Sequence, residues 1–283
     1  AAITIAINVF ILISNTLVIL TLRRMGRLTI QHYYILGLVG SDLIVFIITV
    51  AIAGIELKRE VWISQSLCGL LGTSSAGAAN ITALIHTAMS IDRWVSVQFP
   101  FKYRSFKTEA RSSYITITII ICSFVVGLVY PYILYHFELL GIYFDPSIPF
   151  CIITKGKRGL FGLMSCTLIF VIMPSTLQAF TNIHMLFKVT KLQGANRART
   201  FKSMKTVLTT LGAFYLCWFP IGIWVLWEMS SNLHPNGGFT YFATRMLLSN
   251  SGMSFLIYFM TLPGLKDKFN SIVNDSLPQW TSQ

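Results

Sequence analysis

Long apolar runs separated by short polar segments organise this chain. Seven runs each carry at most one formal charge and are long enough to cross a bilayer as a helix, which takes ~20 residues. They predict helices at residues 1–22, 33–55, 61–97, 112–137, 159–188, 203–229 and 239–262. The alternation typical of membrane barrels is absent. The pattern therefore predicts an all-α fold, a single seven-transmembrane domain over residues 1–283.

Both ends of the chain add to this picture. It begins without methionine inside an apolar run, which we interpret as a piece of a longer protein. After the last span, Leu262-Pro263-Gly264 breaks the helix. Leu265, Phe269 and Ile272 then recur at helical spacing among charged residues. This pattern predicts a short interfacial helix at residues 264–274.

The composition, 54% hydrophobic and only 11% charged, indicates an integral membrane protein. The net charge of +12 comes from basic residues in the short loops, which argues against a nucleic-acid partner. Sixteen of the 22 Lys and Arg residues lie in segments 23–27, 93–111, 188–205 and 266–268. By the positive-inside rule these segments are cytoplasmic. The N-terminal side is then extracellular and the C-terminus cytoplasmic.

Two of the five cysteines, Cys68 and Cys151, fall on the predicted outer side. A disulfide persists in that oxidising setting and would tie the loop before the fifth span to the third span. The alternative is two free thiols. Cys122, Cys166 and Cys217 fall inside spans, where they are expected as small packing residues.

The spans also carry motifs in a characteristic order. Asp92-Arg93-Trp94 ends the third span, where an acid–base pair marks a helix reaching the water interface. The others are Ser14-Asn15-Thr16-Leu17-Val18, Leu38 with Asp42, Pro100-Phe101, Pro174, Phe214 with Cys217-Trp218-Phe219-Pro220, Asn250-Ser251 and Tyr258. In this order and spacing they resemble a rhodopsin-like (class A) G-protein-coupled receptor along essentially the whole chain.

The resemblance implies a conformational switch. Pro220 removes a backbone hydrogen bond and permits a hinge in the sixth span, beside the large ring of Trp218. Asp92 would hold Arg93 until that helix moves out and exposes it to the G protein. The implied switch and coupling residues are Asp92, Arg93, Trp94, Pro100, Phe101, Phe214, Trp218, Pro220 and Tyr258.

Asp42 is an acid in the middle of a span and therefore a functional candidate. The resemblance implies a sodium ion there. The alternative is a hydrogen-bonded polar core with water and no ion. The polar residues implied around it are Asn15, Thr82, Asn250, Ser251 and Ser254.

Several positions depart from the family pattern. Phe255 stands in Ser254-Phe255-Leu256-Ile257-Tyr258 where the seventh span usually has proline, and Trp94 replaces a usual tyrosine. The remaining switch residues favour a working switch over lost or constitutive signalling. A receptor-fold decoy without G-protein coupling is the alternative.

The resemblance also implies a ligand pocket among the outer halves of the spans. Ser75 stands where amine receptors carry an acid, which disfavours a biogenic amine. Leu248 stands where opsins carry the retinal lysine, so no retinal and no other organic cofactor is expected. The implied pocket residues are Ser75, Ala76, Ala79, Asn80, Cys166, Thr167, Trp218, Ile221, Val225 and Thr244.

Charges of both signs in the outer loops favour a peptide ligand over a lipid or a small neutral molecule. At the pocket rim we expect Arg245 to pair with Glu228 or to extend to lipid headgroups. A transporter is disfavoured, because only one span carries a mid-membrane acid and no internal repeat appears. No metal or nucleophile motif indicates an enzyme. The sequence thus predicts a plasma-membrane receptor whose partners are an extracellular ligand, a heterotrimeric G protein and the bilayer.

Overall fold

A computed structural model describes residues 2–24, 29–58, 63–106, 109–145, 150–158, 160–191, 194–230 and 236–261. Within these ranges the side chains of residues 104, 106, 109, 110, 112, 145, 150, 195–207, 210, 211 and 254–261 are not described. The interfacial helix predicted at 264–274 lies outside the described residues.

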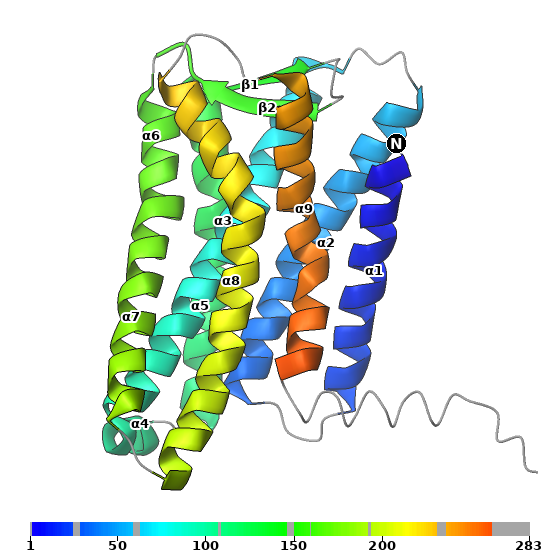
Figure 1. The fold of residues 1–283 in the computed structure, drawn as a ribbon. Coiled ribbons are helices and arrows are strands. Elements are labelled where there is room, and N and C mark those ends of the chain that lie inside the picture. Colours follow the sequence, from blue (N-terminus) through cyan, green and yellow to red (C-terminus); the bar gives the residue numbers. More distant parts are fainter. Residues whose placement is uncertain are drawn as a thin grey trace, which may run out of the picture.

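Long helices run side by side as a bundle (Figure 1). They are α1 (Ala2–Arg23), α2 (Ile30–Lys58), α3 (Gln65–Gln98), α5 (Glu109–His136), α7 (Met173–Thr190), α8 (Gly194–Ser230) and α9 (Gly237–Thr261). α6 (Phe161–Thr167) and the π-helical turn η1 (Leu168–Ile172) continue directly into α7 as one rod. The structure therefore confirms the predicted helix bundle.

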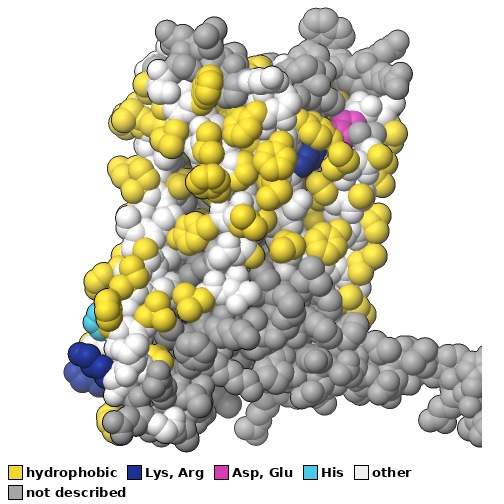
Figure 2. All heavy atoms as spheres, in the orientation of Figure 1, with side chains coloured by type: hydrophobic (Ala, Val, Ile, Leu, Met, Phe, Trp, Pro, Cys, Tyr) yellow, Lys and Arg dark blue, Asp and Glu magenta, His cyan; other side chains and the backbone are white. Residues whose placement is uncertain are grey.

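Six described segments are long and apolar enough to cross a membrane: α1, α2, α3, most of α5, the α6–η1–α7 rod and the end of α8. α9 packs against α1 and α8. Hydrophobic side chains cover most of the coloured surface in Figure 2. A soluble protein rarely exposes so many large apolar side chains, whereas lipid tails solvate them.

Some helix ends differ from the prediction for local reasons. α3 begins at Gln65 rather than 61, because Ser64 caps it and accepts a hydrogen bond from the Leu67 amide at 3.2 Å. α8 begins at Gly194 rather than 203, since alanine, arginine and lysine favour a helix in the basic segment as well. α2 extends at both ends, to Ile30 and Lys58.

Three features were not predicted. A short helix α4 (Pro100–Phe106) follows α3. An antiparallel hairpin of β1 (Leu140–Asp145) and β2 (Phe150–Lys155) crosses one end of the bundle (Figure 1). We call this the hairpin end. The π-helical turn η1 lies just before Pro174, which has no amide hydrogen to donate. At its end the Met173 amide donates to the Leu168 carbonyl, the longer-range bond of a π-helix.

The largest buried cluster lies where α1, α2 and α3 meet, and α5 packs against it. Ile35, Ile81 and Ile85 are wholly buried there. α3 and α5 approach through glycines: a Cβ on Gly127 would lie 2.7 Å from the Ile81 Cγ1 atom and 3.1 Å from the Gly77 carbonyl oxygen. Small residues allow such close backbone contact between membrane helices.

Candidate functional site: an interhelical cavity

A cavity of about 500 Å³ lies within the bundle towards its hairpin end. α3, the α6–η1–α7 rod, α8 and α9 form its walls, and residues of β1 and β2 line it from the hairpin. Its volume falls in the ~300–1,000 Å³ range of small-molecule sites. The residues of the predicted ligand pocket all line this one cavity: Ser75, Ala76, Ala79, Asn80, Cys166, Thr167, Trp218, Ile221, Val225 and Thr244.

The lining is apolar and uncharged. Among its described residues there is no aspartate, glutamate, lysine, arginine or histidine. Asn80 is 7% exposed, and its Nδ2 atom is buried without a hydrogen-bond partner among the described residues. A buried donor of this kind costs free energy until an acceptor reaches it. The cavity therefore suits a neutral, mainly apolar molecule, and an acceptor on it would reach the Asn80 donor once the amide turns towards the cavity.

Sequence reasoning missed Gln178 and Tyr215, which also line the cavity. The Gln178 Nε2 atom donates to the Thr87 hydroxyl at 2.8 Å and to the Ala83 carbonyl at 3.3 Å. Its Oε1 atom accepts from the Tyr215 hydroxyl at 2.9 Å. Gln178 thus joins α3, α7 and α8. A large amide within an apolar span was the available indication, because such a group requires partners.

The hairpin covers the cavity. Cys68 at the start of α3 and Cys151 of β2 form a disulfide, as predicted. Ile152 is 5% exposed and packs against Trp224 of α8. The Trp224 indole donates to the Thr240 hydroxyl of α9 at 3.1 Å. β2, α8 and α9 are therefore tied together over the cavity.

The rings of Phe214 and Trp218 form the inner part of the lining, and the ring of His86 packs against Phe214 outside it. Phe214 and Trp218 lie one helical turn apart on α8, with ring centroids 4.7 Å apart. His86 of α3 meets Phe214 at 5.2 Å. Pro220 lies within α8 directly after this stack. A molecule in the cavity touches Trp218 and Phe214, next to the point where α8 lacks a backbone hydrogen bond.

Away from the hairpin, the end of α3 holds the predicted coupling residues. Arg93 donates to the Gln31 side chain of α2. Asp92 interacts electrostatically with Arg93, and it accepts the Tyr103 hydroxyl of α4 at 2.9 and 3.0 Å. The prediction that Asp92 holds Arg93 thus omitted Gln31 and Tyr103, which come from two other helices.

The neighbouring candidates are arranged around the same end. The Trp94 indole donates to the His184 Nδ1 atom of α7 at 3.1 Å. Pro100 begins α4, and Phe101 is 87% exposed on it. Such exposure leaves the Phe101 ring open to a partner. The side chain of Tyr258 lies outside the described residues.

Comparison with known proteins decides the family. The description "7 transmembrane receptor (rhodopsin family)" matches residues 14–258, most of the chain. The chain belongs to this family. Similar receptors include the muscarinic acetylcholine receptor M5 of Mus musculus and of Homo sapiens, each 28% identical over 114 residues. Each match covers 40% of this chain and 21% of the relative, so it spans about a fifth of the relative's length.

In this receptor Asp42 is 2% exposed, among the residues predicted around it. Asn15 and Ser251 lie beside its carboxyl group and interact with it. Asn15 also donates to the Ile11 carbonyl at 3.0 Å and to the Ser251 carbonyl at 3.1 Å. The Asp42 Oδ2 and Asn15 Oδ1 atoms are buried and have no hydrogen-bond partner among the described residues.

The other residues predicted around Asp42 have no described contact with its carboxyl group. Thr82 shares a hydrogen bond of 2.8 Å with Ser41 and also donates to the Ala78 carbonyl. Asn250 is half-buried on α9, and the Ser254 side chain lies outside the described residues. Asp42, Asn15 and Ser251 thus form the described centre of this core.

The predicted environment of Arg245 is wrong. Arg245 pairs with Glu56 of α2, and its guanidinium lies 4.6 Å from the centroid of the Tyr241 ring. The other Glu56 oxygen accepts the Thr4 hydroxyl at 2.7 Å. Glu228 instead accepts the Thr154 hydroxyl of β2 at 2.8 Å. At 5% exposure Arg245 does not extend to headgroups, because Glu56 on the adjacent helix neutralises it inside the bundle.

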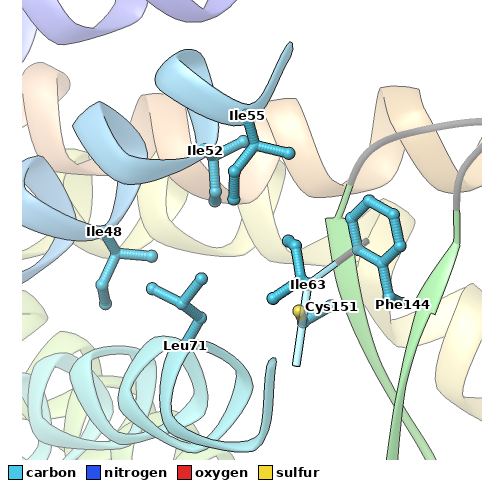
Figure 3. A pocket seen from close by; sticks show the side chains of 7 residues that line it. All are labelled: Ile48, Ile52, Ile55, Ile63, Leu71, Phe144 and Cys151. Atoms are coloured by element: carbon cyan, nitrogen blue, oxygen red, sulfur yellow. The ribbon is translucent and has the colours of Figure 1, made fainter. Parts of the chain in front are cut away.

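A second, much smaller pocket lies beside the disulfide (Figure 3). Its volume is about 10 Å³, and side chains such as Ile48, Ile52 and Phe144 point into it. It is barely large enough for one water molecule and offers almost no polar partner. The larger cavity is therefore the candidate ligand site of this receptor.

Proposed function

We propose that this receptor binds an extracellular ligand in the cavity and activates a heterotrimeric G protein through outward movement of α8. The hairpin end faces outward and the Arg93 end faces the cytoplasm of a plasma-membrane protein. The distribution of Lys and Arg supports this orientation. One observation carries the proposal: Trp218 and Phe214, directly before Pro220 on α8, line the cavity.

The same geometry suggests how binding reaches the other end. A ligand against Trp218 presses on α8 beside the position where Pro220 provides no amide hydrogen. Bending there costs less than in an unbroken helix, so the half of α8 before Pro220 swings outward. Ligand and G protein both favour this bent state, and each increases the affinity for the other.

The coupling face consists of Arg93, Pro100 and Phe101. In this structure Gln31 and Asp92 hold Arg93 against α2 and α4. In the active state Arg93 exchanges these partners for the G protein, and the exposed Phe101 ring inserts into an apolar pocket of it. Trp94 and Lys188 anchor α3 to α7 meanwhile, because Lys188 donates to the Gln98 carbonyl at 3.0 Å.

The experiment is a ligand screen on cells that express the full-length receptor with a promiscuous G protein, followed by the substitution Arg93→Ala. We expect Arg93→Ala to abolish ligand-driven nucleotide exchange while surface expression stays near wild type. Lys102→Ala, an exposed lysine on α4, is the control. Unchanged signalling in Arg93→Ala would refute the role of Arg93. A wild type that binds ligand without nucleotide exchange would indicate the decoy alternative.

The cavity shifts the expected ligand class. Charged outer loops favoured a peptide, but a peptide terminus needs a charged partner, and none lines the cavity among the described residues. A cation such as the acetylcholine in the relatives' name lacks a carboxylate there for the same reason. A neutral, largely apolar ligand fits this lining better than either.

We also propose that Asp42 binds sodium. The Asp42 Oδ2 and Asn15 Oδ1 atoms, which have no hydrogen-bond partner among the described residues, are hard oxygen donors that suit this cation. Ser251 adds a hydroxyl. Thr82, Asn250 and Ser254 complete the implied set. The ion would neutralise the buried carboxylate. We expect Asp42→Asn to remove the effect of sodium on agonist affinity; a wild type without any such effect would exclude the ion.

A further inference from the structure

The cavity wall facing the membrane is formed by residues that are also exposed on the outside of the bundle. Ile172 of η1 is 50% exposed, and Phe219 and Leu226 of α8 are 69% and 65% exposed. Ile223, between them on α8, is 39% exposed. All four line the cavity. We call them the η1–α8 rim. Because the same side chains face the cavity and the surroundings, the rim is the boundary between the two.

Few described interactions hold the rim together. Among the described residues, Tyr215 links α8 to the α6–η1–α7 rod on the side away from the hairpin: it donates to Gln178 and also interacts with Ser175. η1 is itself a π-helical turn, a local irregularity often found at functional sites. In Figure 2, hydrophobic side chains gather over the half of α8 nearer the hairpin and lie along α7. In a bilayer, lipid tails would lie directly against the rim.

The hairpin end is the more closed side among the described residues. Ile152 packs on Trp224, Thr154 bonds to Glu228, and Trp224 bonds to Thr240. A molecule from water has to separate β2 from α8 and α9 to pass there. A molecule from the bilayer has only to displace flexible apolar side chains such as Ile172 and Leu226.

Asn80 supplies the polar requirement. It lies on the α3 wall, and its Nδ2 donor is covered and unpartnered among the described residues, so it meets a ligand once the amide turns towards the cavity. A carbonyl, ester or hydroxyl oxygen would satisfy this donor, whereas a pure hydrocarbon would leave it unpaired. The rest of the lining is apolar and suits an apolar ligand surface.

We infer that the ligand is a neutral lipid with a hydrogen-bond acceptor, and that it reaches the cavity from the bilayer through the η1–α8 rim. This inference rests on the proposed function, because it names the ligand class and the route for the same site. The acyl chain lies along the apolar walls, and the acceptor of the polar head meets Asn80.

The test uses the full-length receptor in phosphatidylcholine nanodiscs with a photoreactive monoacylglycerol that carries a diazirine in its acyl chain. Labelled residues are located by mass spectrometry, and the labelling rate is followed. The rim variant combines Ile172→Trp with Leu226→Trp. Its matched control combines Leu168→Trp with Leu216→Trp, which are 57% and 66% exposed on η1 and α8 but do not line the cavity.

Two further substitutions keep the test decisive. Gly222→Trp narrows the rim from a position where an added Cβ meets nothing within 4 Å, so it should not disturb folding. Its control is Gly212→Trp, which has equal space on α8 but does not line the cavity. Ala79→Trp fills the cavity from the opposite wall.

We expect label on cavity residues in wild type and both controls, labelling slowed several-fold in both rim variants, and none in Ala79→Trp. Asn80→Leu should weaken labelling several-fold, but not labelling by a diazirine alkane. Loss of label in Ala79→Trp with unchanged rates in both rim variants would disprove the route. Absence of cavity labelling in wild type would disprove the lipid. Neither result affects the Arg93→Ala signalling test, which judges the proposed function separately.

Discussion

In the packed sector, made of α1, α2, α3 and α5, helices pack closely and α3 and α5 approach through their backbones. In the cavity sector, made of η1, α7 and α8, the helices border an open space of about 500 Å³. Gly127 of the packed sector has no room for a Cβ, and Gly222 of the cavity sector has nothing within 4 Å of one. Close packing resists deformation. The comparison supports the proposal that α8 moves against a closely packed frame.

The largest effect should come from the buried ion pair that ties α9 to the packed sector. Arg245→Ala leaves Glu56 charged and buried, which we expect to cost about 3–5 kcal/mol of stability. The measurement is thermal unfolding of the purified receptor. The double variant Arg245→Ala with Glu56→Ala should recover part of the loss. Equal stability of Arg245→Ala and wild type would contradict this assignment.

The same substitution, glycine to alanine, should change stability in opposite directions in the two sectors. Gly127→Ala forces α3 and α5 apart and should cost about 1–3 kcal/mol. Gly222→Ala meets no neighbour and removes a flexible glycine from a helix, so it should stabilise by about 0.5–1 kcal/mol. Melting temperatures of the two variants measure this contrast. If both fall alike, the cavity sector is as tightly packed as the frame.

A smaller effect is expected where α8 is joined to α7. Tyr215→Phe removes the hydrogen bond to Gln178, worth about 1 kcal/mol, and frees α8 to move outward. Basal nucleotide exchange should rise several-fold without ligand. Tyr132→Phe, at an exposed tyrosine of α5, is the control. Identical basal activity in the two variants would show that this bond does not hold α8.

The smallest effect belongs to the exposed pair Lys157–Glu138, with 79% and 50% of the side chains exposed. The hydrogen bond from Lys157, together with its charge, holds the pKa of Glu138 below its usual 4.5. A carboxylate whose pKa is lowered in the folded state stabilises the fold above pH 4.5. This stabilisation is lost as the pH falls through the lowered pKa. Lys157→Ala should therefore leave the melting temperature at neutral pH unchanged, since water screens the pair. A clear drop would mean that this pair is not screened.

The sequence by itself determined the membrane class, the approximate positions of the spans and the family. It could do so because backbone groups in lipid must bond within a helix, so hydropathy marks each span. The Cys68–Cys151 pairing was also predictable, since only these two cysteines fell in the outer segments. The pocket residues were predicted from the family resemblance, and the structure places them around one cavity.

Tertiary structure decided which side chains meet. Hydropathy leaves the rotation of each apolar helix open, so it could not show that Arg245 faces Glu56 rather than Glu228, or that Gln178 faces Tyr215. Nor could it show the hairpin over the cavity or the exposed rim between η1 and α8. These follow from how the helices pack, because burial and hydrogen bonding between distant segments exist only once the bundle is assembled.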